Sequence, residues 1–231
     1  MTGIAIELRG VVYQYPQGSF KLQIDHLALR AGEITIVQGE NGSGKSTMAK
    51  LMAGVYHPGQ GSVILAGQPA DTLSLGRIGR MIGYLWQKPE QQLFAHNVLE
   101  ELLFVGRLNS PAQSLEHREA AEDDARNWLR LFEIEHLAGR SSFFLSRGEK
   151  QRVALAAVLH QGARYLILDE PTTGLDQERK RTLSGILAKL NRERSIGMTI
   201  ISHDAKFAEE LAHRSVTLAR GEIADARAIA H

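Results

Sequence analysis

The residues best suited to chemistry in this sequence form a glycine-rich stretch at positions 39–47. It contains a glycine, four free positions and then Gly-Lys-Ser. The apolar run at 34–37 predicts a buried strand before it, and apolar residues at helical spacing predict a helix after it. Glycines let the backbone N–H groups turn inward around an anion, and the positive end of a helix adds to that attraction. The stretch therefore predicts a site for a nucleoside triphosphate.

Each member of this stretch has an expected role. We expect Lys45 to reach the β- and γ-phosphates and the Ser46 hydroxyl to bind Mg²⁺. The simpler alternative is a glycine turn that only joins a strand to a helix, and the order of strand, loop and helix disfavours it. The predicted nucleotide-binding set is Gly39, Asn41, Gly42, Ser43, Gly44, Lys45, Ser46 and Thr47.

Composition limits the other possibilities. The 231 residues are 43% hydrophobic, which excludes disorder for the bulk of the chain. Lys and Arg number 27 against 26 Asp and Glu, so charge gives no reason to expect nucleic-acid binding. There is no cysteine, which excludes disulfides, thiolate metal sites and a cysteine nucleophile. No apolar run approaches the roughly 20 residues of a membrane span, so we expect any membrane role to come through a partner.

Two adjacent acids form a second candidate group. Asp169 and Glu170 directly follow the aliphatic run 166–168, which predicts a strand buried on both faces. At the carboxyl end of such a strand, Asp169 is suited to hold Mg²⁺, and Glu170 to polarise a water for attack on the γ-phosphorus. Surface charge is the alternative, and three large aliphatics before the acids and Pro171 after them disfavour it.

Gln87 and His203 end two further predicted strands. The Gln87 amide is able to touch both Mg²⁺ and the attacking water, and the His203 imidazole to donate to the γ-phosphate. Taken singly, each is more often plain polar surface, so both assignments depend on position at a strand end. Tyr15 precedes Pro16, which fixes a turn that would present the ring beside the glycine-rich stretch. Its alternative is a strand-end tyrosine packed on its neighbours.

The order of predicted elements indicates an α/β core with an inserted helical part. Residues 4–38 are β-rich, whereas residues from 88 to about 139 are mostly helical. We expect one domain over 1–231, with the core at 1–87 and 161–231 and a helical subdomain at about 88–160. Further helices are predicted at 150–160 and about 178–191. An apolar stripe in the helical part consists of Ala121, Ala125, Trp128, Leu129 and Phe132.

Taken together, these motifs resemble the ATP-binding subunits of ABC transporters, over nearly the whole chain. The resemblance implies a P-loop NTPase core, made of a mixed sheet with an N-terminal antiparallel β part, plus an inserted α-helical subdomain. The six motifs, in family order, are the Walker A loop at 39–47, the Q-loop at Gln87, the signature at 145–149, Walker B at 166–169 followed by the catalytic Glu170, the D-loop at Asp176 and the H-loop at His203.

The resemblance also implies ligands and partners. ATP and Mg²⁺ would be bound, with Tyr15 stacked on adenine. The chain would form a homo- or heterodimer in which Ser146 and Gly148 cap the γ-phosphate held by the other subunit, and Asp176 communicates between the two sites. Covering an exposed γ-phosphate with another helix N-terminus is physically sound. Integral membrane subunits would complete the transporter and hold the chain at the cytoplasmic face of the membrane.

The signature departs from the usual Leu-Ser-Gly-Gly-Gln at two positions. Glu149 in place of glutamine is a mild change. Arg147 in place of the first glycine is less mild, because a long cation must find room near a triphosphate. We expect it to be tolerated.

A finer resemblance follows Gln87, where residues 87–95 are similar to ATPases of energy-coupling factor transporters and of the cobalt and nickel group, which import vitamins and metal ions. In such systems this segment borders a groove for the membrane subunit. Leu93, Phe94 and Val98 would supply apolar contacts there, with Glu100 and Glu101 nearby. The alternative is that these side chains pack inside the helical part.

Two other function classes stay open. One is a soluble ABC ATPase acting on DNA or the ribosome. Only about a hundred residues, without sustained heptads, separate Walker A from the signature, so the long coiled coil of the DNA-maintenance group has no place. Excision-repair members need zinc-binding cysteines, and translation factors carry two ATPase cassettes in one chain. This sequence has neither feature. The other is an exporter ATPase, which the segment after Gln87 disfavours.

Overall fold

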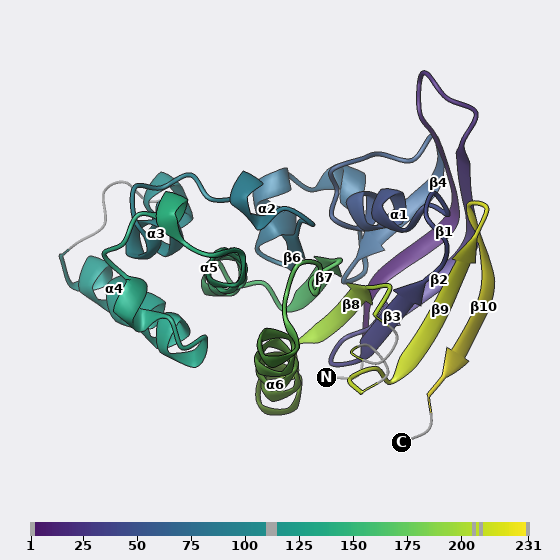
Figure 1. Cartoon of the computed structure of the whole chain (residues 1–231). Helices are drawn as coiled ribbons and strands as arrows, with labels where there is room; N and C mark the ends of the chain where they lie inside the picture. The colour runs from purple at the N-terminus through teal and green to yellow at the C-terminus, as the bar shows by residue number, and fades with distance from the viewer. Residues whose placement is uncertain (1–2, 110–114, 205–206, 208–209, 230–231) are drawn as a thin grey trace.

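The computed structural model describes residues 3–109, 115–204, 207 and 210–229, and it contains two sheets. The smaller sheet is antiparallel, in the order β2-β1-β4-β5. It lies at the end of the molecule opposite helices α3 and α4 (Figure 1). Its strands are β1 (Ile4–Gln14), β2 (Lys21–Arg30), β4 (Gln60–Leu65) and β5 (Gln68–Pro69).

The larger sheet has the order β10-β9-β3-β8-β7-β6 and is parallel apart from its edge strand β10. Every residue of β7 and β8 is buried, as expected for parallel strands covered on both faces. Because the carboxyl ends of parallel strands share one edge, the segments after β3, β6, β7 and β8 meet there. The strands are β3 (Ile34–Gln38), β6 (Ile82–Leu85), β7 (Tyr165–Asp169), β8 (Gly197–Ile201), β9 (Arg214–Ala219) and β10 (Glu222–Ala228).

The helices separate into those that flank the sheets and a group that stands apart from the antiparallel sheet. Figure 1 shows α3, α4 and α5 together at one end, while α1 lies between the two sheets and α6 covers the other face of the larger sheet. Short 3₁₀ turns occupy Ala70–Thr72, Pro89–Gln91, Glu135–Leu137 and Ser142–Phe144. The α-helices are α1 (Lys45–Met52), α2 (Leu75–Gly79), α3 (Val98–Asn109), α4 (Leu115–Leu131), α5 (Arg147–His160) and α6 (Gln177–Arg194).

The two faces of the larger sheet contribute to two core layers. Successive residues of β7 alternate between them: Ile167 packs with α1 and the antiparallel sheet, whereas Leu168 packs with α6 and the helical part. The predicted stripe, on α4 and the residue that follows it, also faces the second layer, with Ala125, Leu129 and Phe132 fully buried. The mixed sheets and the helical insertion confirm the fold class expected from the sequence.

The start of α5 differs from the sequence expectation. A helix was expected from Lys150, but α5 begins at Arg147, so the second half of the signature forms its first turn. The Ser146 hydroxyl accepts from Glu149 N (3.4 Å), and the Glu149 carboxylate accepts from Ser146 N (2.7 Å). This capping box satisfies two backbone donors at the helix start, and the Glu149 side chain forms one half of it.

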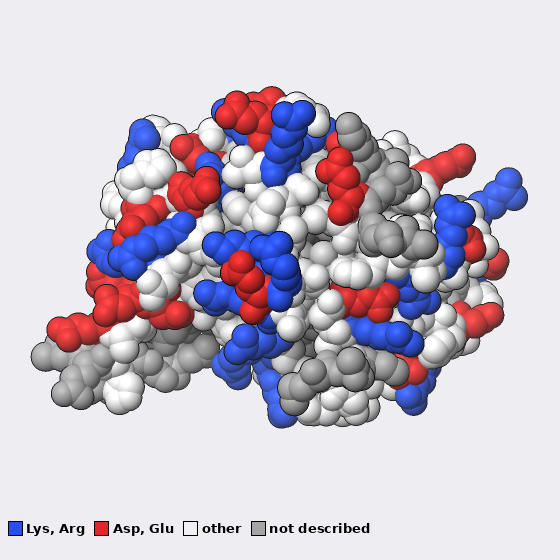
Figure 2. All heavy atoms as spheres, turned by 90° about the horizontal axis from the view of Figure 1, so that it is seen from below, with Lys and Arg blue, Asp and Glu red and all other residues white. Residues whose placement is uncertain are grey.

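Two surface properties bear on partners. Among the described residues, no helix is both long enough and apolar enough to cross a bilayer. On the face seen in Figure 2, basic and acidic side chains are interspersed, so the described part of that face has no continuous basic surface.

Candidate nucleotide-binding site

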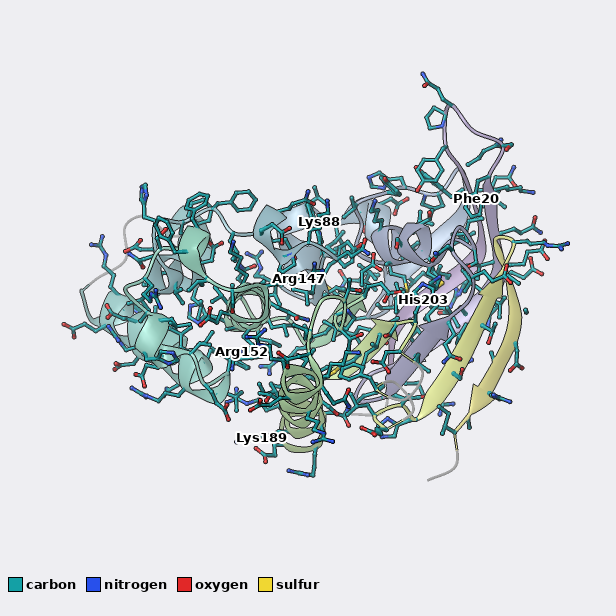
Figure 3. All side chains as sticks on the ribbon, viewed as in Figure 1. Phe20, Lys88, Arg147, Arg152, Lys189 and His203 are labelled. Atoms are coloured by element: carbon teal, nitrogen blue, oxygen red, sulfur yellow. The ribbon has the colours of Figure 1, made fainter. Side chains whose placement is uncertain are left out.

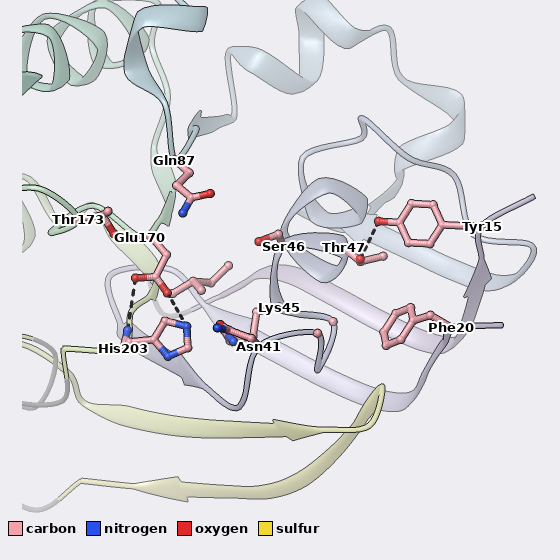
Figure 4. Close-up of a pocket in the computed structure, with 13 residues that line it drawn as sticks. Tyr15, Phe20, Asn41, Lys45, Ser46, Thr47, Gln87, Glu170, Thr173 and His203 are labelled. Atoms are coloured by element: carbon pink, nitrogen blue, oxygen red, sulfur yellow. Dashed lines mark hydrogen bonds and ion pairs between the residues drawn. The ribbon is translucent and has the colours of Figure 1, made fainter. Parts of the chain in front are cut away.

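A cavity of about 700 Å³ opens at the carboxyl edge of the larger sheet (Figure 4). Ten of its thirteen lining residues are site residues predicted from the sequence, drawn from five separate segments of the chain. The lining residues are Tyr15, Phe20, Asn41, Gly42, Gly44, Lys45, Ser46, Thr47, Gln87, Glu170, Thr173, Ile201 and His203.

The glycine-rich loop forms one wall, between β3 and α1. Gly39 and Gly44 have φ of 146° and 107°, a region that favours glycine. A Cβ on Gly39 would lie 2.2 Å from the Leu218 carbonyl oxygen, so no side chain fits there. Gly39 and Ser43 shape the loop from behind and are not among the lining residues; Ser43 is buried, and its hydroxyl has no hydrogen-bond partner among the described residues.

Lys45 is held inside this loop. Its ammonium donates to the carbonyl oxygens of Gly39 (2.7 Å) and Glu40 (2.8 Å). Burial lowers the Lys45 pKa, and the negative charges of Glu170 and Asp169 oppose that shift. The loop thus keeps a cation at its concave side, where the phosphates of a nucleotide would meet it.

The residues expected to hold Mg²⁺ contact each other. The Ser46 hydroxyl donates to Asp169 Oδ1 at 3.2 Å, and the Tyr84 hydroxyl donates to Oδ2 at 3.2 Å. Burial raises the Asp169 pKa, and the two donors lower it. Asp169 lies behind Ser46 and does not line the cavity.

This donor set fits Mg²⁺. A hydroxyl and one carboxylate are hard oxygen ligands, and magnesium sites that also use substrate phosphates need few protein ligands. A cluster of three or more His, Asp or Glu side chains of the kind that holds a metal by itself is missing from the described residues. Ser46 and Asp169, together with Gln87, which lines the same cavity, would therefore hold Mg²⁺ with the nucleotide.

Glu170, the second acid of the pair, lies against His203 at the cavity wall (Figure 4). Glu170 has φ of 52°, a rare value for a residue with a side chain, and its N–H donates to the Ile201 oxygen at 2.9 Å. Glu170 Oε2 accepts from His203 N at 3.4 Å; Oε1 lies 3.1 Å from His203 Nε2, an ion-pair distance that does not meet hydrogen-bond geometry. Burial raises the Glu170 pKa, and His203 lowers it. A raised pKa suits a carboxylate that must accept a proton.

Tyr15 satisfies both readings of the sequence. Its ring packs edge-on against Tyr13, with centroids 5.1 Å apart, and its hydroxyl is hydrogen bonded to Thr47 Oγ1 at 2.9 Å. It also lines the cavity, opposite Phe20 (Figure 4). Packing against its neighbours therefore orients the ring at the cavity wall.

Ser146, Gly148 and Asp176 do not line this cavity. Ser146 and Asp176 are the N-cap residues of α5 and α6, and Gly148 and Asp176 line a second cavity of about 330 Å³. The structure thus separates these three from the nucleotide cavity of their own chain. Their assignment to a site on another subunit stays a prediction.

Four residues near the site are not predicted by the sequence motifs: Phe20, Thr173, Ile201 and Tyr84. Phe20 lies beyond the turn after Tyr15, and a Cβ on Gly44 would come within 2.9 Å of its Cζ. An aromatic residue in the same hairpin as Tyr15 was the only available signal for it. For Tyr84, the signal was its place three residues before Gln87 in a buried strand.

The apolar contacts expected beside the Q-loop need correction. Leu93 is 8% exposed and Val98 is fully buried, so both pack inside the helical part. Glu101 is also buried, and its carboxylate accepts from the N–H groups of Phe94 (2.8 Å) and Ala95 (2.7 Å). Only Phe94 of the three apolar residues stands outward, at 70% exposed.

Fold and site together define a P-loop ATPase with an inserted helical subdomain. The energy-coupling factor transporter ATP-binding protein EcfA of Methanothermobacter thermautotrophicus is 36% identical over 221 residues, which are 94% of this chain and 69% of that protein. The structure of cbiO1 from Clostridium perfringens, part of the ABC transporter complex cbiONQ, has a TM-score of 0.85 at 28% identity and covers 96% of this chain and 88% of its own.

A dimeric, post-hydrolysis structure of the ATP-binding cassette MJ0796, bound to ADP and Pi, has a TM-score of 0.80 at 26% identity and covers 98% of this chain and 99% of its own. The ABC transporter family profile matches residues 22–173. The chain belongs to the ABC transporter family. It is an ATPase subunit of such a transporter, and this confirms the resemblance seen in the sequence.

The expectation that arginine is tolerated at position 147 of the signature can be tested. Its guanidinium donates to the Gln87 carbonyl oxygen at 2.9 Å and lies against Gly174, so the long side chain finds room within its own subunit (Figure 3). An exposed bond of this kind is worth about 0.5–1 kcal/mol. We therefore expect Arg147→Gly to keep the steady-state ATPase rate within about fivefold of the unaltered chain. Arg147→Lys, which keeps the charge, is the control. A large loss in Arg147→Gly alone would show that the arginine contributes to closure.

Proposed function

We propose that this chain is the ATPase of an importer of the energy-coupling factor type, dimerising around two ATP molecules to drive uptake of a vitamin or metal ion. The observation that carries this proposal is the assembly of the phosphate loop, Glu170, Gln87 and His203 around one cavity, with Asp169 directly behind Ser46. The relatives of the chain include EcfA and cbiO1. The residues of the site support ATP hydrolysis, and the relatives support transport of the energy-coupling factor type.

The geometry supports a division of labour in hydrolysis. Lys45 and the loop N–H groups would bind the triphosphate and neutralise its charge. Ser46 and Asp169 would hold Mg²⁺, which would supply positive charge against the negative charge that develops on the phosphates during transfer. Glu170 would take a proton from the attacking water, and His203, which lies against that carboxylate, would keep the base oriented and donate to the γ-phosphate.

A dimer would complete the site. The signature residues lie away from their own cavity, at the N-terminus of α5, where the helix dipole favours an anion. A second copy or a related subunit would place that terminus over the exposed γ-phosphate. The dimeric MJ0796 cassette, bound to ADP and Pi, is a precedent for such a pair. Two nucleotides would then bridge the subunits, and hydrolysis would weaken the bridge.

An exposed aromatic patch supports a membrane partner. It consists of Phe94, Phe143 and Phe144, which are 70%, 75% and 82% exposed. Their segments lie side by side, because the Ser142 hydroxyl donates to the Ala95 oxygen at 3.4 Å. Large exposed aromatics gathered in one place mark interaction sites. We assign this patch to a helix of the integral membrane subunit, which would hold the chain at the cytoplasmic face of the membrane.

Phe94→Ser tests this assignment. We expect it to lose co-purification with the membrane subunit in detergent, because the exposed ring contributes contact area and nothing to the described core. Its ATP binding should be unchanged, and Phe94→Leu, which keeps an apolar side chain, should still co-purify. Retention of the membrane subunit by Phe94→Ser would remove the patch from the interface.

The same purification separates the alternative functions. An integral membrane protein recovered with the unaltered chain supports transport, whereas ribosomes or DNA recovered with it would support a soluble ABC ATPase. The direction of transport can be measured after reconstitution in vesicles with the co-purified subunits. ATP-dependent uptake of a vitamin or metal ion supports the importer, and extrusion would support an exporter.

A further inference from the structure

Tyr84 contacts the predicted metal site and belongs to none of the ABC transporter motifs. It lies on β6, is 9% exposed, and its hydroxyl donates to Asp169 Oδ2 at 3.2 Å. The Ser46 hydroxyl donates to the other oxygen of the same carboxylate, also at 3.2 Å. Asp169 is thus held on both oxygens, by the phosphate loop on one side and by β6 on the other.

Strand register explains how Tyr84 reaches Asp169. In the parallel pairing of β6 with β7, Tyr84 lies opposite Ile167. Ile167 and Asp169 are two residues apart, so their side chains lie on the same face of the sheet. Tyr84 belongs to the same core layer as Ile167 and Met48 of α1. Packing in this layer directs the phenol along the sheet toward the carboxylate.

The end of β6 is fixed by a second contact. The Gln92 side-chain amide donates to the backbone carbonyl oxygen of Tyr84 at 2.7 Å and accepts from the backbone N–H of Trp86 at 2.8 Å. It pairs with the strand backbone as a neighbouring strand would, directly before Gln87. The Tyr84 backbone therefore has one position relative to β7, and its hydroxyl has one position relative to Asp169.

We propose that Tyr84 is a positioning residue for Mg²⁺ binding, which keeps the Asp169 carboxylate oriented toward Ser46. The proposal rests on the proposed role of Ser46 and Asp169 as ligands. Removing the phenol oxygen would deprive buried Oδ2 of its described donor and free the carboxylate to rotate. Loss of a partner that orients a metal ligand costs about 10–100-fold in metal affinity. Nucleotide contacts made by the phosphate loop itself would be untouched.

The test measures Mn²⁺, as a probe for Mg²⁺, by electron paramagnetic resonance in the presence of a non-hydrolysable ATP analogue. Tyr84→Phe keeps the ring and removes only the hydroxyl. We expect its Mn²⁺ affinity to fall by about 10-fold or more. Its affinity for the same analogue in EDTA should match that of the unaltered chain.

Tyr165→Phe is the matched control. Tyr165 lies on β7, is 1% exposed, and its hydroxyl is hydrogen bonded to Thr199 Oγ1 at 2.8 Å. The change removes an equivalent buried hydroxyl, and it should leave Mn²⁺ affinity unchanged. Equal losses in both variants, or unchanged Mn²⁺ affinity in Tyr84→Phe, would overturn the positioning role. If the unaltered chain bound the analogue but showed no protein-bound Mn²⁺, the proposed role of Ser46 and Asp169 as metal ligands would fail instead.

Discussion

Glu170→Gln should bind ATP and hydrolyse it about 10²–10⁴-fold more slowly than the unaltered chain. The substitution keeps the size of the side chain and removes the carboxylate that accepts a proton. Glu170 lies 3.1 Å from His203 Nε2 at the cavity wall, and burial raises its pKa. Among the described residues that line the cavity, Glu170 is the one acid, so no other carboxylate there duplicates its chemistry. Because hydrolysis is blocked, the ATP-bound variant should accumulate as a closed dimer. Phosphate release measures the rate, and gel filtration with ATP measures the dimer.

Glu40→Gln is the matched control for this prediction. Glu40 lies in the phosphate loop and is exposed, and its described contact with the site is made by the backbone carbonyl that accepts from Lys45. Its turnover should therefore equal that of the unaltered chain. Near-normal turnover in Glu170→Gln would remove Glu170 as the general base. A loss of ATP binding in Glu170→Gln would place this residue in the nucleotide cradle.

Lys45→Ala should weaken ATP binding by about 10–100-fold. The reason is that the Lys45 ammonium, held by the carbonyls of Gly39 and Glu40, is the cation that the loop places on its concave side. Charge-assisted hydrogen bonds are worth about 1.5–3 kcal/mol each, and about 1.4 kcal/mol corresponds to tenfold in affinity. Isothermal titration calorimetry with a non-hydrolysable analogue measures the change. The fold should persist, because alanine at the start of α1 is a good helix residue.

Lys50→Ala provides the comparison for Lys45→Ala. Lys50 belongs to the same helix, lies over the Tyr56 ring at 5.2 Å, and is not among the residues that line the cavity. It should leave ATP affinity nearly unchanged. Unchanged binding in Lys45→Ala, or equal losses in both variants, would contradict the assigned role of the phosphate loop.

Local patterns in the sequence predicted most of the residues that the structure brings together at one cavity. The spacing of glycines, Lys45 and Ser46 determines a strand–loop–helix unit whose backbone chemistry depends little on the rest of the fold. The acids after a buried strand, together with Gln87 and His203 after their own strands, must meet wherever a parallel sheet gathers its carboxyl ends. All of these residues except Asp169, Gly39 and Ser43 line one cavity, and those three lie directly behind it.

The local sequence pattern did not predict which apolar side chains of the helical part are buried and which are exposed. Leu93, Phe94 and Val98 are alike in hydropathy, and only packing against α3 and its neighbours decides that two are buried and one is exposed. The start of α5 was misplaced for a related reason. Residues 145–149 were expected to precede the helix, whereas the reciprocal bonds of Ser146 and Glu149 begin the helix at Arg147.

The sequence by itself determined the family of this protein and the residue types gathered at its site: a phosphate loop, an acid that we propose holds Mg²⁺ and an acid that we propose is the general base. The tertiary structure alone decided which other side chains serve them. Tyr84 and Asp169 are 85 residues apart in the chain, and they meet because β6 and β7 pair in one parallel register. Such a contact is set by how strands align in a packed core, and a single sequence does not state that alignment.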